Sequence, residues 1–142
     1  MGWEHHKRPI DARTGAGTDL RVGGTRSVWT SQAAASTALG PRGVFGLAST
    51  STDTTPLVHT LAAPNAGDRL ELVVENLATS SSPIHVNAIS GGKFDGSTQS
   101  GSTASANMIT LTSAGAGCAL VASSSSRWHL VGNSGCTLST ST

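Results

Sequence analysis

Aromatic and charged side chains are scarce in this 142-residue chain, which holds three Trp, two Phe and no Tyr. Charged residues make up 12% of it, about half the ~25% of an ordinary globular domain. Ser, Thr, Ala, Gly and Asn replace them, so the chain lacks the high net charge of ordinary disordered proteins. Those residues are mediocre to poor helix formers, whereas short Thr- and Val-containing runs broken by Gly favour strands. The composition predicts an all-β fold.

Cysteine is also scarce, because Cys118 and Cys136 are the only two and cannot form a disulfide scaffold. The start of the chain, WEHHKRP after Met-Gly, does not read as a secretory signal, so we expect a reducing compartment and two free, buried thiols. The two cysteines flank the last predicted hairpin, and a position on adjacent strands stays open. With a thin core and neither disulfide nor metal, oligomerisation is the expected source of further stability.

Strong charge of one sign and long apolar runs are absent from the sequence. The formal net charge is +1, which gives no case for nucleic-acid binding through a basic surface. No apolar run approaches the ~20 residues that span a bilayer. We therefore expect neither a nucleic acid nor a membrane as partner.

Residues 1–55 differ in composition from the rest and are interpreted as an extended N-terminal arm and linker. Frequent glycines interrupt any long element. Residues 20–22 and 27–30 are short segments that can pair with another strand, and residues 32–39 predict one or two helical turns ending at Gly40-Pro41. Residues 48–55, ASTSTDTT, read as a linker.

Residues 56–142 show the alternation of a half-buried β structure and are interpreted as one β-barrel or sandwich module. Short apolar runs at 8–12-residue spacing predict a small antiparallel barrel or sandwich. The predicted strands include residues 57–61, 70–76, 84–89, 108–112, 118–121 and 128–131. The predicted core consists of Leu70, Leu72, Val74, Ile84, Val86, Leu120, Trp128 and Leu130.

Two parts of this module resemble each other in sequence. Ala66–Val73 aligns with Ala114–Val121, and the Ser-rich Ser80–Val86 resembles Ser124–Val131. Each copy reads as strand, Ser-rich turn and strand, so the sequence predicts a duplicated hairpin that buries its apolar face against its copy or a neighbouring chain.

No motif in the chain predicts catalysis, a metal site or a cofactor. The five histidines lack supporting Cys or carboxylate spacing, and by alternation His85 and His129 fall on the face opposite the apolar one. Glu71 and Glu75 read as surface charges on one strand. The Ser runs lack the G-x-S-x-G setting of an exposed nucleophile, and no glycine pair precedes the Lys-Ser/Thr of a phosphate loop. We expect a protein that is not an enzyme.

Large apolar and basic side chains on the arm point instead to binding. Aromatic residues and Arg are the types most enriched at interface hot spots. The arm has too few apolar residues to bury its aromatic side chains in a core of its own. The predicted partner-contact residues are Trp3, Arg8, Arg13, Arg21, Arg26, Trp29 and Phe45. An arm that wraps around its own module or a sister subunit is the alternative, and the two do not exclude each other.

Two segments of the module resemble a β-rich unit of tailed-bacteriophage structural proteins. Leu61–Gly67, LAAPNAG, stands where that unit opens with TLPAP-x-AG, and Trp128–Gly135, WHLVGNSG, stands where it closes with WxxVxxxG. The resemblance covers residues 56–142. A compact chain with this unit and an arm is similar to capsid decoration (cement) proteins.

The resemblance implies a structural protein on the phage head surface, assembled in the host cytoplasm, that binds the major capsid protein and stabilises the capsid as a homotrimer. A head-fibre or tail-fibre receptor-binding module is the alternative. A polysaccharide depolymerase is disfavoured, because the eight acidic residues are spread along the sequence. We expect deletion of residues 1–55 to leave a folded module that no longer binds capsids.

Overall fold

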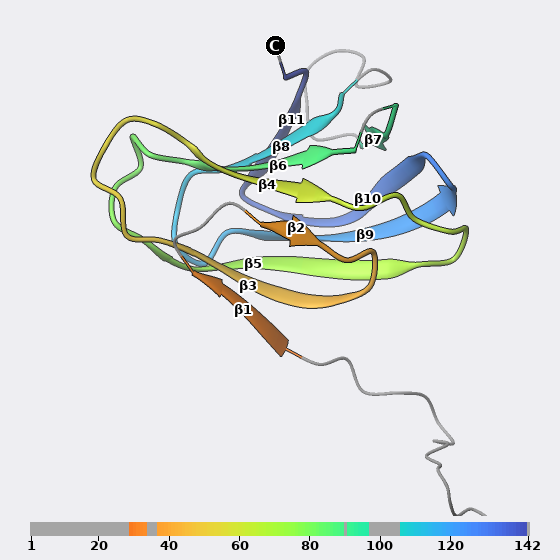
Figure 1. Cartoon of the computed structure of the whole chain (residues 1–142), viewed down its shortest axis with the longest axis horizontal. Helices are drawn as coiled ribbons and strands as arrows, with labels where there is room; N and C mark the ends of the chain where they lie inside the picture. Colours follow the sequence, from red (N-terminus) through yellow and green to blue (C-terminus); the bar gives the residue numbers. More distant parts are fainter. Residues whose placement is uncertain (1–28, 34–36, 90, 97–105, 142) are drawn as a thin grey trace, which may run out of the picture.

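Two β-sheets make up the computed structural model, which describes residues 29–33, 37–89, 91–96 and 106–141 (Figure 1). The six-stranded sheet has the order β1 (Trp29–Ala33), β3 (Gly43–Ser49), β5 (Arg69–Leu77), β9 (Gly117–Ser124), β10 (Arg127–Ser134) and β7 (Lys93–Asp95). The five-stranded sheet has the order β11 (Cys136–Ser139), β8 (Met108–Leu111), β6 (Ile84–Ala88), β4 (Leu57–Leu61) and β2 (Ala38–Leu39). All regular elements of the described residues are strands, which confirms the all-β prediction.

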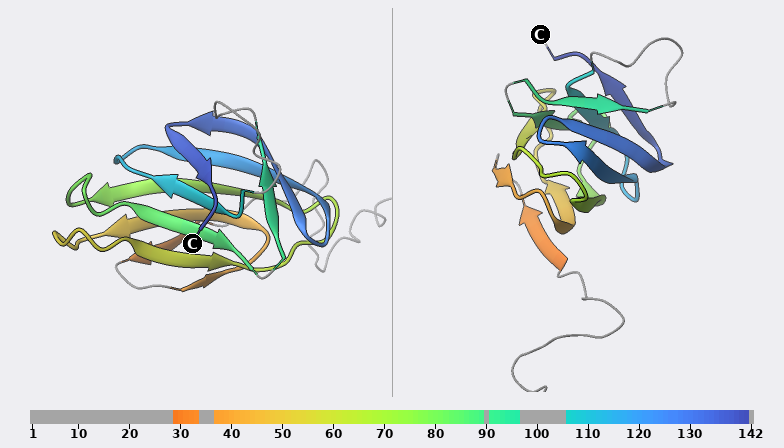
Figure 2. Two further views of the ribbon diagram at one scale, coloured as in Figure 1. Left: turned by 90° about the horizontal axis from the view of Figure 1, so that it is seen from above. Right: turned by 90° about the vertical axis from the view of Figure 1, so that its right-hand side faces the viewer.

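The sheets are mixed rather than antiparallel, and they do not close into a barrel. β3 runs parallel to both β1 and β5, and β4 runs parallel to both β2 and β6. The reason is that the chain alternates between the two sheets from β2 to β6. A strand of one sheet therefore connects two parallel neighbours in the other; β4, for example, connects β3 to β5. Figure 2 shows the two layers as separate open sheets. The prediction of a purely antiparallel module was therefore wrong, and of the two predicted alternatives, barrel or sandwich, the closed barrel is not formed.

β3 lies in the interior of its sheet, although the sequence placed it in the arm. It is hydrogen-bonded between β1 and β5, and Phe45 and Leu47 are buried in the common core. Leu39 of β2 is 1% exposed and belongs to the same core. β1, β2 and β3 all lie within the range 1–55, so a deletion of 1–55 removes strands of both sheets. This placement argues against the expectation that residues 56–142 fold without them.

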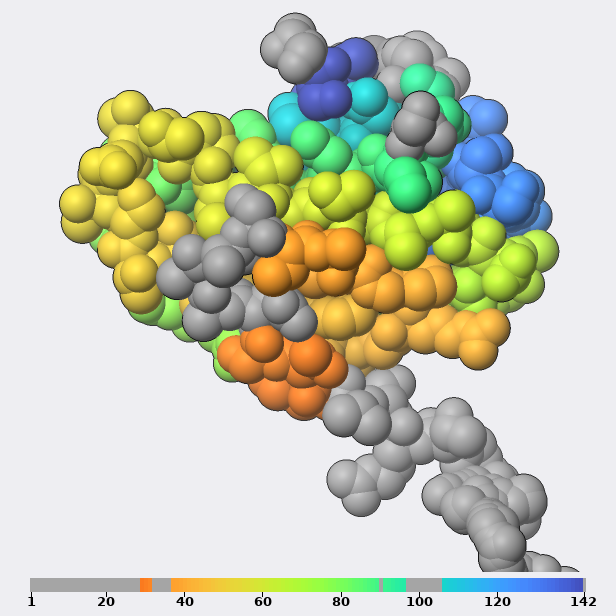
Figure 3. Space-filling model, viewed as in Figure 1, coloured from red at the N-terminus to blue at the C-terminus, as the bar shows by residue number. Residues whose placement is uncertain are grey.

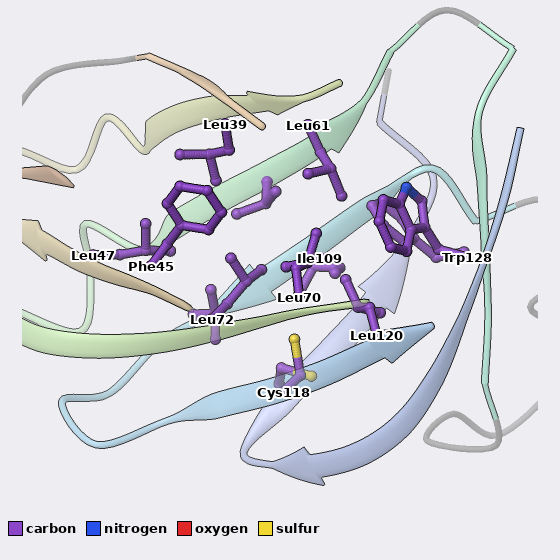
Figure 4. Packing of buried hydrophobic residues seen from close by; sticks show 14 of the residues in the cluster. Leu39, Phe45, Leu47, Leu61, Leu70, Leu72, Ile109, Cys118, Leu120 and Trp128 are labelled. Atoms are coloured by element: carbon purple, nitrogen blue, oxygen red, sulfur yellow. The ribbon is translucent and has the colours of Figure 1, made fainter. Parts of the chain in front are cut away.

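The predicted module strands are present, with their apolar alternation pointing inwards. In β5, Leu70, Leu72 and Val74 are buried, whereas Glu71 and Glu75 are exposed. Figure 4 shows residues of both sheets meeting between the layers. The buried residues also include Ile84, Val86, Leu120 and Trp128, and the partly buried Leu130 packs against them.

The helical turns predicted for residues 32–39 are not formed at either end of this segment, where the structure has strands instead. Gln32 and Ala33 continue β1, and Ala38 and Leu39 form β2, while residues 34–36 lie outside the described part. β2 pairs with β4 in the register Leu39↔Leu61. Burial of Leu39 outweighs the weak helical preference of an Ala-rich segment.

Only one copy of the duplicated hairpin exists. β9 and β10 pair antiparallel around a turn at Ser125 and Ser126, as predicted. β5 and β6, the strands of the other copy, lie in different sheets. The six residues between β5 and β6 carry the chain from one layer to the other, so Ile84 buries its side chain from the opposite side of the core.

Substitution of Trp128 by Ala tests the packing at the β7–β10 end of the core. Trp128 is 1% exposed and is in register with Phe94 of β7 and Ala122 of β9. Removal of a fully buried indole leaves a cavity, and we expect the free energy of unfolding to fall by about 3–5 kcal/mol. Urea-induced unfolding measures this change. Val131→Ala on the same strand, at a residue 60% exposed, is the control, with little expected effect; equal stability of the two variants would contradict the described packing.

His59 is a polar residue in the middle of the apolar core. Its side chain is 0% exposed, and its Nδ1 accepts a hydrogen bond from the Thr37 backbone N–H at 3.2 Å. Nε2 has no hydrogen-bond partner among the described residues. Burial lowers the pKa of His59 from its ordinary value of 6.5, because the protonated ring loses its hydration. The folded protein therefore holds His59 in the neutral form.

This lowered pKa predicts a loss of stability in mild acid. Below the ordinary histidine pKa of about 6.5 the unfolded chain binds a proton that folded His59 resists, so the free energy of unfolding falls as the pH decreases from 7.5 to 5.5. We expect His59→Leu to reduce this pH dependence, measured by urea unfolding at both pH values. His129→Gln, at an exposed ring, should preserve it. An unchanged pH dependence in His59→Leu would show that His59 is not its source.

Candidate docking surface

The partner-contact residues predicted from the sequence separate into three groups. Five of them lie outside the described residues: Trp3, Arg8, Arg13, Arg21 and Arg26. Trp29 lies on β1 and is 49% exposed. Phe45 is 7% exposed and lies in the core, so its assignment as a surface contact is corrected. It faces inwards because it is in register with Leu72, whose side chain also points into the core.

Trp29 stands on the outer face of the six-stranded sheet, at its edge. It is in register with Val44, and Ser31 is in register with Gly46 and, through β3, with Val73 of β5. These positions alternate with the inward-facing Phe45 and Leu47, so their side chains point away from the core. Figure 3 shows β1, coloured orange, on the surface at the margin of the molecule.

A glycine on β3 makes room for the Trp29 ring. A Cβ atom at Gly46 would overlap Cζ2 of Trp29 and the carboxyl group of Glu75. Ser31 Oγ donates a hydrogen bond of 2.7 Å to Glu75 Oε2, which ties β1 to β5 across β3. We call Trp29, Ser31, Gly46 and Glu75 the β1 edge cluster. It fixes an indole ring across the neighbouring strand while half of its surface remains in solvent.

The β1 edge cluster offers two means of binding another protein. A preset, half-exposed Trp gives a large apolar contact at little cost in side-chain entropy. β1 is also the last strand of its sheet in the described part of the chain, and a strand at a sheet edge has backbone groups that can pair with an added strand. The sequence identified Trp29 from its residue type; Ser31, Gly46 and Glu75 were missed as a set, because their contact depends on strand order.

A second polar cluster, not foreseen from the sequence, lies near the opposite edge of the same sheet. Arg127 donates two hydrogen bonds to Asp95, Nε to Oδ2 at 2.5 Å and Nη2 to Oδ1 at 3.1 Å, and this ion pair raises the pKa of Arg127. Ser123 Oγ lies 2.7 Å from His129 Nε2. The order Ser–His–Asp resembles a hydrolase triad in outline.

The distances show that this cluster is not built as a nucleophilic triad. His129 Nδ1 is 3.8 Å from Asp95 Oδ2, beyond a hydrogen bond, so the carboxylate does not orient the imidazole. Asp95 is engaged by Arg127 through both oxygens instead. A Ser–His–Asp triad requires a histidine held by its carboxylate. The pairing joins β7 to β10 at the sheet edge, a structural role.

The surface of the described residues includes shallow grooves. One, of about 350 Å³, is lined by the β3–β4 loop from Ser49 to Leu57. Another, of about 310 Å³, lies on the outer face of the six-stranded sheet and includes Gly117, Ala119 and Gly132 in its lining. Within the described ranges, no three His, Cys, Asp or Glu residues are grouped to hold a metal ion. No helix there is long and apolar enough to cross a membrane.

Comparison with known proteins adds no family assignment. The chain matches no protein-family model, and no curated protein is similar to it.

The position of the Trp29 ring can be tested by a double-mutant cycle with Gly46. Because a Cβ at Gly46 displaces the ring, we expect Gly46→Ala to lower the free energy of unfolding by about 1 kcal/mol, the low end for overpacking since an edge side chain can move. In a Trp29→Ala background the same substitution should cost less. Urea unfolding of the four proteins gives the coupling energy. Equal costs in both backgrounds would mean that the ring does not cover Gly46.

Proposed function

We propose that this protein is a capsid decoration (cement) protein, a structural virion protein that binds the outside of a phage head and stabilises the capsid, as a homotrimer. Its partner is the major capsid protein, and its location is the head surface, after assembly in the host cytoplasm. The observation that carries the proposal is the β1 edge cluster: a half-exposed Trp on an edge strand, directly after the basic N-terminal segment.

The geometry of this edge suits attachment to a large protein shell. A strand from a capsid subunit can add to β1 through backbone hydrogen bonds while Trp29 enters an apolar pocket. Residues 1–28, which directly precede β1 in the sequence, contain Trp3 and five basic residues. Three copies in a trimer raise the effective concentration of each weak contact. Resistance to the pressure of packaged DNA then comes from many such bridges between capsid subunits.

The two segments that resemble the phage unit contact β9 of the six-stranded sheet from either side, which supports treating them as one unit. The turn at the end of Leu61–Gly67 bonds to β9, since Gly67 N–H donates to Ala122 C=O at 2.8 Å. Ala122 is in turn the register partner of Trp128, the first residue of the other segment. Asp68 braces the turn by accepting from Asn65 N–H at 2.8 Å and from Arg42. The hydrogen bond from the Asn65 backbone N–H and the Arg42 guanidinium hold the pKa of Asp68 below its usual value.

Co-sedimentation with phage heads tests the proposal. Expanded heads, produced by the encoding phage without this gene, are mixed with full-length protein, and bound copies are counted at saturation. We expect saturable binding in a fixed, large ratio to the capsid subunit. Trp29→Ala should weaken it by at least tenfold, as for a hot-spot residue worth about 2 kcal/mol, while Val131→Ala binds normally.

Other outcomes of this experiment are equally informative. Absence of binding by the folded full-length protein would overturn the decoration role. Binding of only a few copies per particle would place the protein in a head fibre or tail fibre. Full binding by Trp29→Ala together with saturation would keep the cement role but exclude the β1 edge cluster as its main contact. Deletion of residues 1–28, which spares every described strand, separates the contribution of the N-terminal segment from that of β1.

A further inference from the structure

Cys118 and Cys136 are brought together from the two different sheets. Cys118 lies on β9 of the six-stranded sheet, between its register partners Leu72 of β5 and Asn133 of β10. Cys136 is the first residue of β11 in the five-stranded sheet and is in register with Leu111 of β8. Both residues belong to the buried core cluster, at 7% and 6% exposure. The sequence alone left their relation open.

A tight corner between β10 and β11 sets this arrangement. Asn133 accepts a hydrogen bond from Cys136 N–H at 2.9 Å through Oδ1 and donates from Nδ2 to Cys136 C=O at 3.2 Å. Gly135 has a φ of 85°, which a side chain would disfavour. Because Asn133 is the strand neighbour of Cys118, fixing Cys136 on Asn133 places it beside Cys118. The corner therefore carries the chain from one sheet to the other and places the Cys136 thiol beside the Cys118 thiol.

The two thiols are in direct contact. Their side chains share a hydrogen bond, and Figure 4 shows Cys118 among the buried residues between the two sheets. That hydrogen bond, with burial, raises the pKa of Cys118, whereas it lowers the pKa of Cys136 by stabilising its thiolate. Cys136 is consequently the better nucleophile of the pair.

We propose that Cys118 and Cys136 are an oxidation site that forms an inter-sheet disulfide when the protein meets a low-molecular-weight disulfide such as oxidised glutathione. The Cys136 thiolate attacks one glutathione sulfur, and the first glutathione leaves as a thiolate. The Cys118 thiolate then attacks Cys136 Sγ and releases the second glutathione. The cysteines lose two electrons in total, which reduce the glutathione disulfide, and their two protons pass to the departing thiolates.

The bond would join the two layers where β11 forms an edge. β11 pairs only with β8 among the described strands. The disulfide would therefore link this edge strand covalently to β9 of the other sheet. The closed loop contains β10 and is close in length to the ~15-residue loops for which disulfides restrict the unfolded chain substantially. The inference stands independently of the proposed function.

Oxidative refolding of the full-length protein tests the site. Reduced, urea-unfolded protein is refolded in a buffer of oxidised and reduced glutathione, where both thiols are reachable. We expect a monomer whose mass falls by about 2 Da, the two lost hydrogens. Trypsin cleaves after Lys93 and Arg127, so the bond links peptides 94–127 and 128–142 until a reductant separates them. The oxidised protein should have a Tm higher by about 10 °C.

Matched variants decide between the disulfide and other products. Cys118→Ala and Cys136→Ala should each yield at most a glutathione adduct. The double variant should show the same Tm after refolding in the glutathione buffer and in a fully reducing buffer. A folded wild-type protein that retains two free thiols or carries a single glutathione would overturn the proposal. Disulfide-linked dimers as the main product, or a linked monomer with an unchanged or lower Tm, would overturn it as well.

Discussion

The burial of β3 between β1 and β5 is the constraint on which the rest of the structure depends. With few aromatic residues available, the core needs the apolar side chains of β2 and β3 in addition to those of the C-terminal strands. Phe45 and Leu47 fill the inner face of the six-stranded sheet, and the chain alternates between the two layers to reach these places. This alternation makes the sheets mixed, and it leaves β1 as an edge strand that follows the N-terminal segment.

The two faces of β3 connect stability to the candidate docking surface. Its inward residues hold the layers together, whereas Gly46 on the outer face gives space to Trp29 and Glu75. A residue with a side chain at position 46 would push the indole off the sheet. The same strand therefore anchors the core and shapes the surface that we propose to bind the capsid. A large aromatic ring fixed at an edge is suited to repeated, identical contacts on a symmetric shell.

Polar groups inside the core limit how the molecule responds to its surroundings. His59 resists protonation in the folded protein, because burial would strip the charged ring of its hydration and Nε2 has no hydrogen-bond partner among the described residues. Cys118 and Cys136 form a thiol pair that links the two sheets. Both features lie at contacts between segments that are apart in the sequence, since Thr37 bonds to His59 and Cys118 meets Cys136. Acid is therefore expected to act on the five-stranded sheet at His59, whereas the proposed oxidation acts on the contact between the two sheets.

The sequence by itself determined the β class, most strand positions and the inward face of strands such as β5, because period-two alternation is a local property that burial preserves. Its residue types also predicted Trp29 as a contact residue, and the structure shows that the Trp29 side chain is half-exposed. Strand partners, the inclusion of β2 and β3, the crossing from β5 to β6 and the meeting of Cys118 with Cys136 were decided only by tertiary structure. Leu39 and Phe45 stand in glycine-rich, weakly patterned surroundings, and only the space left between two sheets selects their burial. Long-range packing, which no short window of sequence contains, settled these features.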